Sequence, residues 1–217
     1  QNVIVGNLVG VKESATIEDM GVTGDSLKIR SGFENTTDSV MSFTGGTRTF
    51  AIGPTADTYR YVVRGQRYQE LAQKNVIWPD VEGSHYFYFD STQTLQTMMS
   101  PGGLSDEMIR NYALVAVLYW DQTAQLILYR GELRHPYPMD EDTRVYLHNV
   151  FGARWRSGLA LTGIDADASG NDNSSSQFGV QDGEFFNDNM LITVTDGAPQ
   201  DIGPIGQLPV YYIAGPS

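Results

Sequence analysis

Short stretches that alternate aromatic or aliphatic residues with polar ones recur along this 217-residue chain, separated by turn-forming residues. Residues 58–64 and 66–71 flank Gly65, and residues 40–43 and 47–52 flank a Thr-Gly-Gly turn. A period of two is the period of a β-strand, and glycine at such turns favours hairpins. The pattern therefore predicts an all-β, mainly antiparallel fold of the β-sandwich or jelly-roll type.

Three segments depart from this alternation. Residues 113–120 are nearly all apolar, which predicts a strand buried on both faces. Residues 140–151 predict one short α-helix, because Asp140 can cap its start and Gly152 can end it. Residues 105–111 could form one or two helical turns. The helix over 140–151 is expected to pack against a sheet through an apolar stripe made of Val145, Tyr146, Val150 and Phe151.

The order of these segments suggests a simple domain organisation. We expect an N-terminal extended arm or linker over residues 1–39 and a β-rich domain over 40–217, with a possible sub-boundary near 100–104. Residues 165–177 have no apolar side chain larger than alanine, which predicts a solvated loop. Because the chain starts with Gln and stops soon after an apolar run, we expect it to be a fragment of a longer protein.

Composition excludes several classes of partner and chemistry. Acidic residues outnumber basic ones 26 to 14, and the formal charge of -12 disfavours nucleic-acid binding. The chain has no cysteine, which excludes disulfides, thiolate nucleophiles and iron–sulfur clusters. No apolar run approaches the roughly 18 residues of a spanning helix, so membrane insertion is not expected.

Candidate catalytic acids fall into two clusters. Asp140, Glu141 and Asp142 stand at the predicted helix start, where acids stabilise exposed N–H groups without any catalysis. Asp182, Glu184 and Asp188 stand near a predicted strand edge, and close pairs are expected by chance among 26 acids. We therefore predict that the chain is not an enzyme. A glycan depolymerase that works through two of these acids is the less favoured alternative.

Metal sites are also not predicted. Residues 165–176 partly match a calcium loop, but Ser176 stands where a bidentate Glu should close the cage. His85, His135 and His148 show no ligand spacing, and structural or surface roles are favoured for them. No metal and no cofactor is expected.

Aromatic residues on the predicted strands have two interpretations. They could form a platform on which sugar rings stack, or they could pack the core and a subunit interface, which is the favoured interpretation. Arg154, Trp155 and Arg156 form a short basic-aromatic triplet that supports no function by itself. The aromatic residues concerned are Tyr59, Tyr61, Tyr68, Trp78, Tyr86, Phe87, Tyr88 and Phe89.

Two strings are the most specific of the chain: Glu-Leu-Arg-His at 132–135 and Met-Asp-Glu-Asp-Thr-Arg-Val-Tyr-Leu-His at 139–148. Together with several others, they resemble a module of tailed-bacteriophage structural proteins. Asn187, Asp188 and Asn189 stand where this pattern has an acidic tract, so no role of that tract is carried over. The other strings lie at residues 42–43, 47–52, 61–68, 82–90, 115–121, 152–155, 157–159 and 206–212.

The resemblance implies a virion protein of the tail, neck or fibre type. It would assemble as a homo-oligomer and dock other phage virion proteins by surface complementarity rather than by chemistry. The alternative is a receptor module of a phage fibre that binds host surface glycans.

Overall fold

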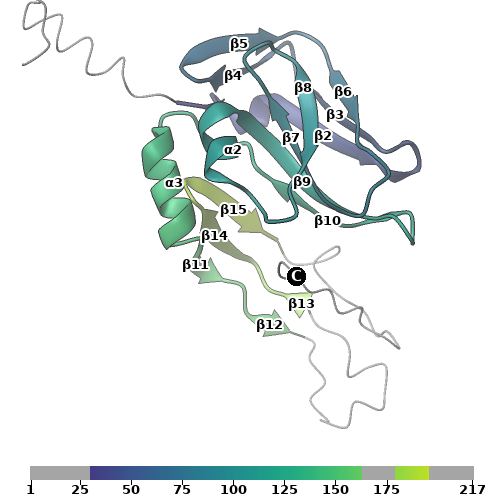
Figure 1. Ribbon diagram of the computed structural model, residues 1–217. Coiled ribbons are helices and arrows are strands. Elements are labelled where there is room, and N and C mark those ends of the chain that lie inside the picture. Colours follow the sequence, from purple (N-terminus) through teal and green to yellow (C-terminus); the bar gives the residue numbers. More distant parts are fainter. Residues whose placement is uncertain (1–29, 163–178, 196–217) are drawn as a thin grey trace, which may run out of the picture. The chain divides into compact units, whose positions relative to one another are not determined.

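The computed structural model describes residues 30–162 and 179–195, and it confirms an all-β protein built mostly from antiparallel strands (Figure 1). The chain divides into two compact units, Gln1–Tyr146 and Leu147–Ser217, which are described separately below. None of the described helices is long and apolar enough to cross a membrane.

Within unit 1, the described residues 30–146 form three antiparallel sheets (Figure 1). The four-stranded sheet has the order β10-β9-β7-β8, with strands β7 Gly83–Phe89, β8 Leu95–Met99, β9 Ala113–Asp121 and β10 Leu126–Glu132. The sheet β1-β4-β5 consists of Gly32–Phe33, Tyr59–Val63 and Gln66–Glu70. The sheet β2-β3-β6 consists of Ser39–Thr44, Thr49–Pro54 and Lys74–Ile77, and the short 3-10 helices η2 (Thr36–Asp38) and η3 (Gly45–Thr47) flank β2. Both predicted hairpins are present, as β2–β3 and β4–β5.

The main core joins side chains from all three sheets, as expected of a β-sandwich. Aromatic rings dominate it: Phe50 stacks on Phe87 and Tyr61 stacks on Phe89, each with ring centroids 4.2 Å apart. Offset aromatic pairs of this kind add about 0.5–1.5 kcal/mol to the burial of their area. Alternating aromatics on the strands therefore build the interior of unit 1.

The other face of the four-stranded sheet is also covered. Tyr86, Tyr88 and Leu114 pack there with residues of two helices, α2 (Asp106–Asn111) and α3 (Glu141–Val150). The register of β9 shifts opposite Phe87 and Tyr88, so that Val115 and Ala116 both reach the main core. The prediction that this strand is buried on both faces is confirmed, as is the helix over 140–151.

Helix α3 buries a different face from the predicted one. Val145 is buried as expected, but Tyr146, Val150 and Phe151 are exposed, so the predicted apolar stripe is wrong at three of its four positions. Glu141 and Arg144 occupy the buried face instead. Positions 141, 144 and 145 follow the helical spacing i, i+3, i+4, so two charged residues belong to the inward stripe.

Residues 135–137, near the end of unit 1, form backbone hydrogen bonds with β1, the first described strand. The Phe33 N–H donates to the His135 carbonyl at 2.8 Å, and the Tyr137 N–H donates to the Phe33 carbonyl at 3.1 Å. Gly32 has φ +143, and a Cβ there would lie 2.4 Å from the His135 oxygen, so this approach requires glycine. The Ser31 hydroxyl donates to Glu141 Oε1 at 2.5 Å, which ties the start of α3 to the same place.

Unit 2 holds a sheet of order β11-β14-β15, made of Ala153–Gly158, Gly183–Asn187 and Met190–Val194. A second pair joins β12 Leu161–Thr162 to β13 Gly179–Val180. Gly158 has φ +64, and a Cβ there would lie 2.0 Å from the Asp182 carbonyl oxygen. The chain can make this approach only with glycine at that position.

The predicted domain boundaries remain predictions in part. Most of the arm expected over residues 1–39 lies outside the described residues, while β1, η2 and the start of β2 belong to the sheets of unit 1. Strands on both sides of residues 100–104 share one sheet, and the boundary between the two compact units falls in the sequence between Tyr146 and Leu147.

Candidate functional site

The three acids at the start of α3 have separate structural partners in unit 1. Asp140 caps the helix, because its carboxylate accepts the Thr143 N–H at 2.9 Å and the Thr143 hydroxyl at 2.8 Å. Glu141 is buried against Ser31, and burial raises the pKa of its carboxyl group even though the Ser31 hydrogen bond and Arg144 oppose this. Asp142 pairs with Arg110. Asp140, Glu141 and Asp142 thus serve the structure: one caps α3, one is buried beside Ser31 and one forms an ion pair.

The acids of unit 2 also have individual partners. Asp188 lies buried in the turn between β14 and β15, where its Oδ1 is 3.5 Å from His148 Nδ1. Glu184 lies on β14 and pairs with Arg156 at 3.5 Å. The Asp182 carbonyl accepts the Leu159 N–H at 3.2 Å, which is part of the close approach that requires glycine at position 158. These acids are close in sequence because they lie on or next to the β14–β15 hairpin, where each has its own structural contact.

The other two histidines are buried in unit 1. The His85 Nε2 lies 2.8 Å from the Val81 carbonyl oxygen, and burial lowers the pKa of the ring. His135 is buried where its carbonyl accepts from Phe33. Within residues 30–162 and 179–195, no group of three or more His, Asp or Glu side chains could hold a metal ion. The candidate calcium loop at 165–176 lies outside the described residues.

The candidate sugar platform has most of its rings inside the protein. Tyr59, Tyr61, Trp78, Phe87 and Phe89 have no exposed surface, which confirms the core interpretation for them. Tyr86 and Tyr88 are buried in the second core, beneath α2 and α3. The half-buried Tyr68 stacks on Tyr61 with centroids 5.5 Å apart. These strands therefore offer no open row of rings to a sugar.

Unit 2 does expose an aromatic group, beside two arginines. Trp155 lies on β11 with 70% of its surface exposed, and its ring N–H donates to the Gly158 carbonyl at 2.9 Å. The guanidinium of Arg154 lies 5.7 Å from the ring centres of both Phe151 and Phe186, and that of Arg156 lies 5.8 Å from Phe186. We call these five residues the arginine–aromatic surface.

The local fold explains how this surface arises. All six residues of β11 are exposed, and β11 forms one edge of its described sheet. Arg154 pairs with Phe186 across the sheet, and Arg156, two residues further along β11, lies on the same face and reaches the same ring. Trp155 lies between them in sequence and so points to the other face of the strand. The surface therefore wraps around an edge strand.

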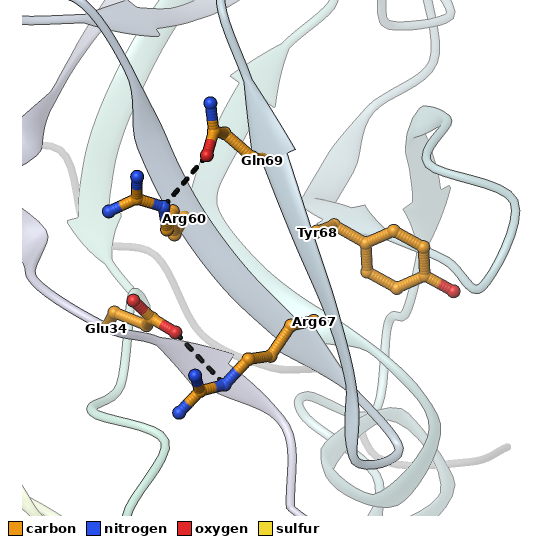
Figure 2. A pocket seen from close by; sticks show the side chains of 5 residues that line it. All are labelled: Glu34, Arg60, Arg67, Tyr68 and Gln69. Carbon is orange, nitrogen blue, oxygen red and sulfur yellow. Dashed lines mark hydrogen bonds and ion pairs between the residues drawn. The ribbon is translucent and has the colours of Figure 1, made fainter.

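A separate pocket of about 310 Å³ lies on unit 1 (Figure 2). Its lining residues are Glu34, Arg60, Arg67, Tyr68 and Gln69. Figure 2 shows the side chains of Arg60, Arg67 and Gln69 on one side of the β4–β5 hairpin, whereas the Tyr68 ring points to the other side. The sequence analysis did not single out this group, although pairing across the Arg64-Gly65 turn puts Arg60 and Arg67 on one face of the hairpin.

Comparisons with protein-family models, curated proteins and solved structures found no match to this chain. The resemblance to tailed-phage structural proteins thus rests on the sequence strings alone and stays a prediction.

Proposed function

We propose that this chain is a non-enzymatic structural component of a tailed-phage particle, a fibre, neck or tail-associated protein. It assembles as a homo-oligomer in the virion and docks other virion proteins. The sequence resemblance supports the phage assignment, and the all-β fold suits a particle that must persist outside a cell. The arginine–aromatic surface of unit 2 supports the assembly role.

The exposure of Trp155 is the observation that carries the assembly role. Tryptophan, arginine and other aromatics are enriched at protein interfaces, and tryptophan and arginine dominate their binding energy. Full burial of a large apolar side chain is worth about 1.5–3 kcal/mol. In unit 2 the indole is 70% exposed on one face of β11, and on the other face the guanidinium groups of Arg154 and Arg156 lie over the Phe186 ring. Such a surface gains most from a partner that covers it.

The partner that fits best is a second copy of this chain. Arg154 and Arg156 give the surface a local positive charge, and Glu184 neutralises only one of them. The chain contains 26 acidic residues, so another copy has carboxylates with which these arginines can pair. Repetition of such a contact builds a symmetric ring or trimer.

The experiment compares Trp155→Ala with Leu71→Ala by sedimentation velocity over a concentration series. Leu71 is a matched control, because it is also apolar and also 70% exposed, but lies in unit 1. We expect the wild type and Leu71→Ala to form the same oligomer, and Trp155→Ala to dissociate at concentrations at least tenfold higher. Circular dichroism checks that each variant is folded. A wild type that stays monomeric, or equal behaviour of the two variants, would refute the assembly role.

A glycan-binding receptor module is the second candidate, because an exposed indole can also stack on a sugar ring. Immunogold electron microscopy of purified phage particles separates the two roles. Label at the neck or along the tail supports assembly, and label at distal fibre tips supports receptor binding. Particles that carry no label would refute the virion assignment itself.

A further inference from the structure

The pocket of Figure 2 is lined by two exposed arginine side chains, each of which has polar partners within unit 1. Arg60 Nε donates to Gln69 Oε1 at 3.0 Å, and Arg67 Nε lies 3.3 Å from Glu34 Oε1. An Nη group of Arg67 also donates to the Tyr137 hydroxyl at 3.3 Å. A guanidinium has five N–H donors, so these contacts orient both groups and leave further donors to face a ligand.

Strand pairing in unit 1 explains why these groups meet. Arg60 on β4 pairs with Gln69 on β5, and Arg67 pairs with Val62 two residues along β4. The Glu34 N–H donates to the Arg60 carbonyl at 3.1 Å, which brings Glu34 to the same edge of the hairpin. Figure 2 shows the terminal nitrogens of Arg60 directed away from Gln69. The sheet thus positions the side chains before any ligand arrives, which lowers the entropy cost of binding.

The charges of the pocket select the kind of ligand. Two guanidinium groups and one carboxylate leave a local charge of about +1, on a chain whose formal charge is -12. A ligand group with one negative charge balances this surplus. A dianion such as phosphate would place its second charge near Glu34, and like charges at close range repel.

We infer that this pocket binds a carboxylate group carried by a small ligand, such as one uronic acid unit of an acidic glycan. The planar fork of a guanidinium matches the two oxygens of a carboxylate. The volume of about 310 Å³ lies at the lower end of ligand pockets and accommodates one sugar ring. The inference does not depend on the proposed assembly role, because the pocket lies in unit 1 and the arginine–aromatic surface in unit 2.

Titration of the full chain with sodium glucuronate, followed by NMR, tests the inference. We expect saturable shifts of the Nε–H signals of Arg60 and Arg67 and of the Gln69 side-chain amide, and no such shifts with glucose. Arg60→Gln should weaken binding at least about tenfold, since it removes a charge-assisted hydrogen-bond donor. Arg130→Gln is the control, because Arg130 is an exposed arginine on β10, in a different sheet.

Acetate and inorganic phosphate distinguish the possible outcomes. If acetate also binds, the carboxylate alone is recognised, and if glucuronate alone binds, the ring contributes as well; both results support the inference. Glu34→Gln should tighten phosphate binding at pH 8 at least about tenfold, because the repulsion is removed. Phosphate that binds the wild type as tightly as glucuronate does would overturn the inference. So would the absence of shifts with glucuronate, or equal losses in Arg60→Gln and Arg130→Gln.

Discussion

Replacement of Arg134 by methionine should destabilise unit 1 strongly. The Arg134 side chain is only 9% exposed. Its Nε and Nη2 donate to the two carboxylate oxygens of Glu132 at 2.7 and 2.6 Å. Its Nη1 donates to the Thr36 and Ser39 carbonyls at 2.8 and 2.7 Å and to the Ser39 hydroxyl at 2.6 Å. One guanidinium therefore joins the end of β10 to η2 and the start of β2.

The magnitude follows from what the substitution leaves behind. Loss of one partner of a buried charged pair costs about 3–5 kcal/mol. The Glu132 side chain is 30% exposed, so water can partly solvate it once Arg134 is gone. We therefore expect the lower end of this range, about 3 kcal/mol of unfolding free energy. Arg130→Met, at an exposed site, removes only a cation–π contact with Phe43 and should cost at most about 1 kcal/mol.

Urea unfolding followed by tryptophan fluorescence measures this loss. In a Trp155→Phe background the emission comes from Trp78 and Trp120, both buried in unit 1, so that the signal reports this unit. A double-mutant cycle with Glu132→Gln should give a coupling energy above about 1 kcal/mol. If Arg134→Met is as stable as Arg130→Met, or if the coupling is zero, the stabilising role of this network is refuted.

Two further predictions concern other sites. The pKa of His85 is lowered by burial, so its contribution to stability is complete above the ordinary pKa of about 6.5 and is lost as pH falls toward the folded-state value. The wild type should therefore lose more unfolding free energy than His85→Gln between pH 7.5 and 5.5, and equal losses would contradict this reasoning. Gly158→Ala should cost more than about 2 kcal/mol, because its Cβ would meet the Asp182 carbonyl. Gly152→Ala has a similar φ but open space, so thermal melts should show a loss of only about 1 kcal/mol; equal losses would mean that φ alone matters.

Local patterns predicted the strands of unit 1 well. The β4–β5 hairpin follows from alternation on both sides of Gly65, and the burial of β9 follows from its unbroken apolar run. These features depend on neighbours in sequence, which the sequence shows directly. The start of α3 was also predictable, since a capping aspartate acts within one helical turn.

The buried face of α3 was not predictable in this way. Glu141 and Arg144 would normally be assigned to solvent, and the buried Glu141 has its hydrogen-bond partner in Ser31, 110 residues away in the sequence. The candidate pocket also depends on residues that are distant in sequence, because Glu34 reaches Arg60 through the pairing of β1 with β4. The exposure of Trp155 depends on how the edge strand β11 is left uncovered, and no local pattern reports that.

The contacts of Ser31 and Phe33 with residues 135–141 have a consequence for synthesis of the chain. During translation, residues 31–33 leave the ribosome early, but their partners leave it only after about a hundred further residues have been added to the chain. Unit 1 therefore cannot complete its fold until the residues of α3 have left the ribosome, and β1 lacks these partners until then. Closure over so long a loop is slow, because its entropy cost precedes the contacts that repay it.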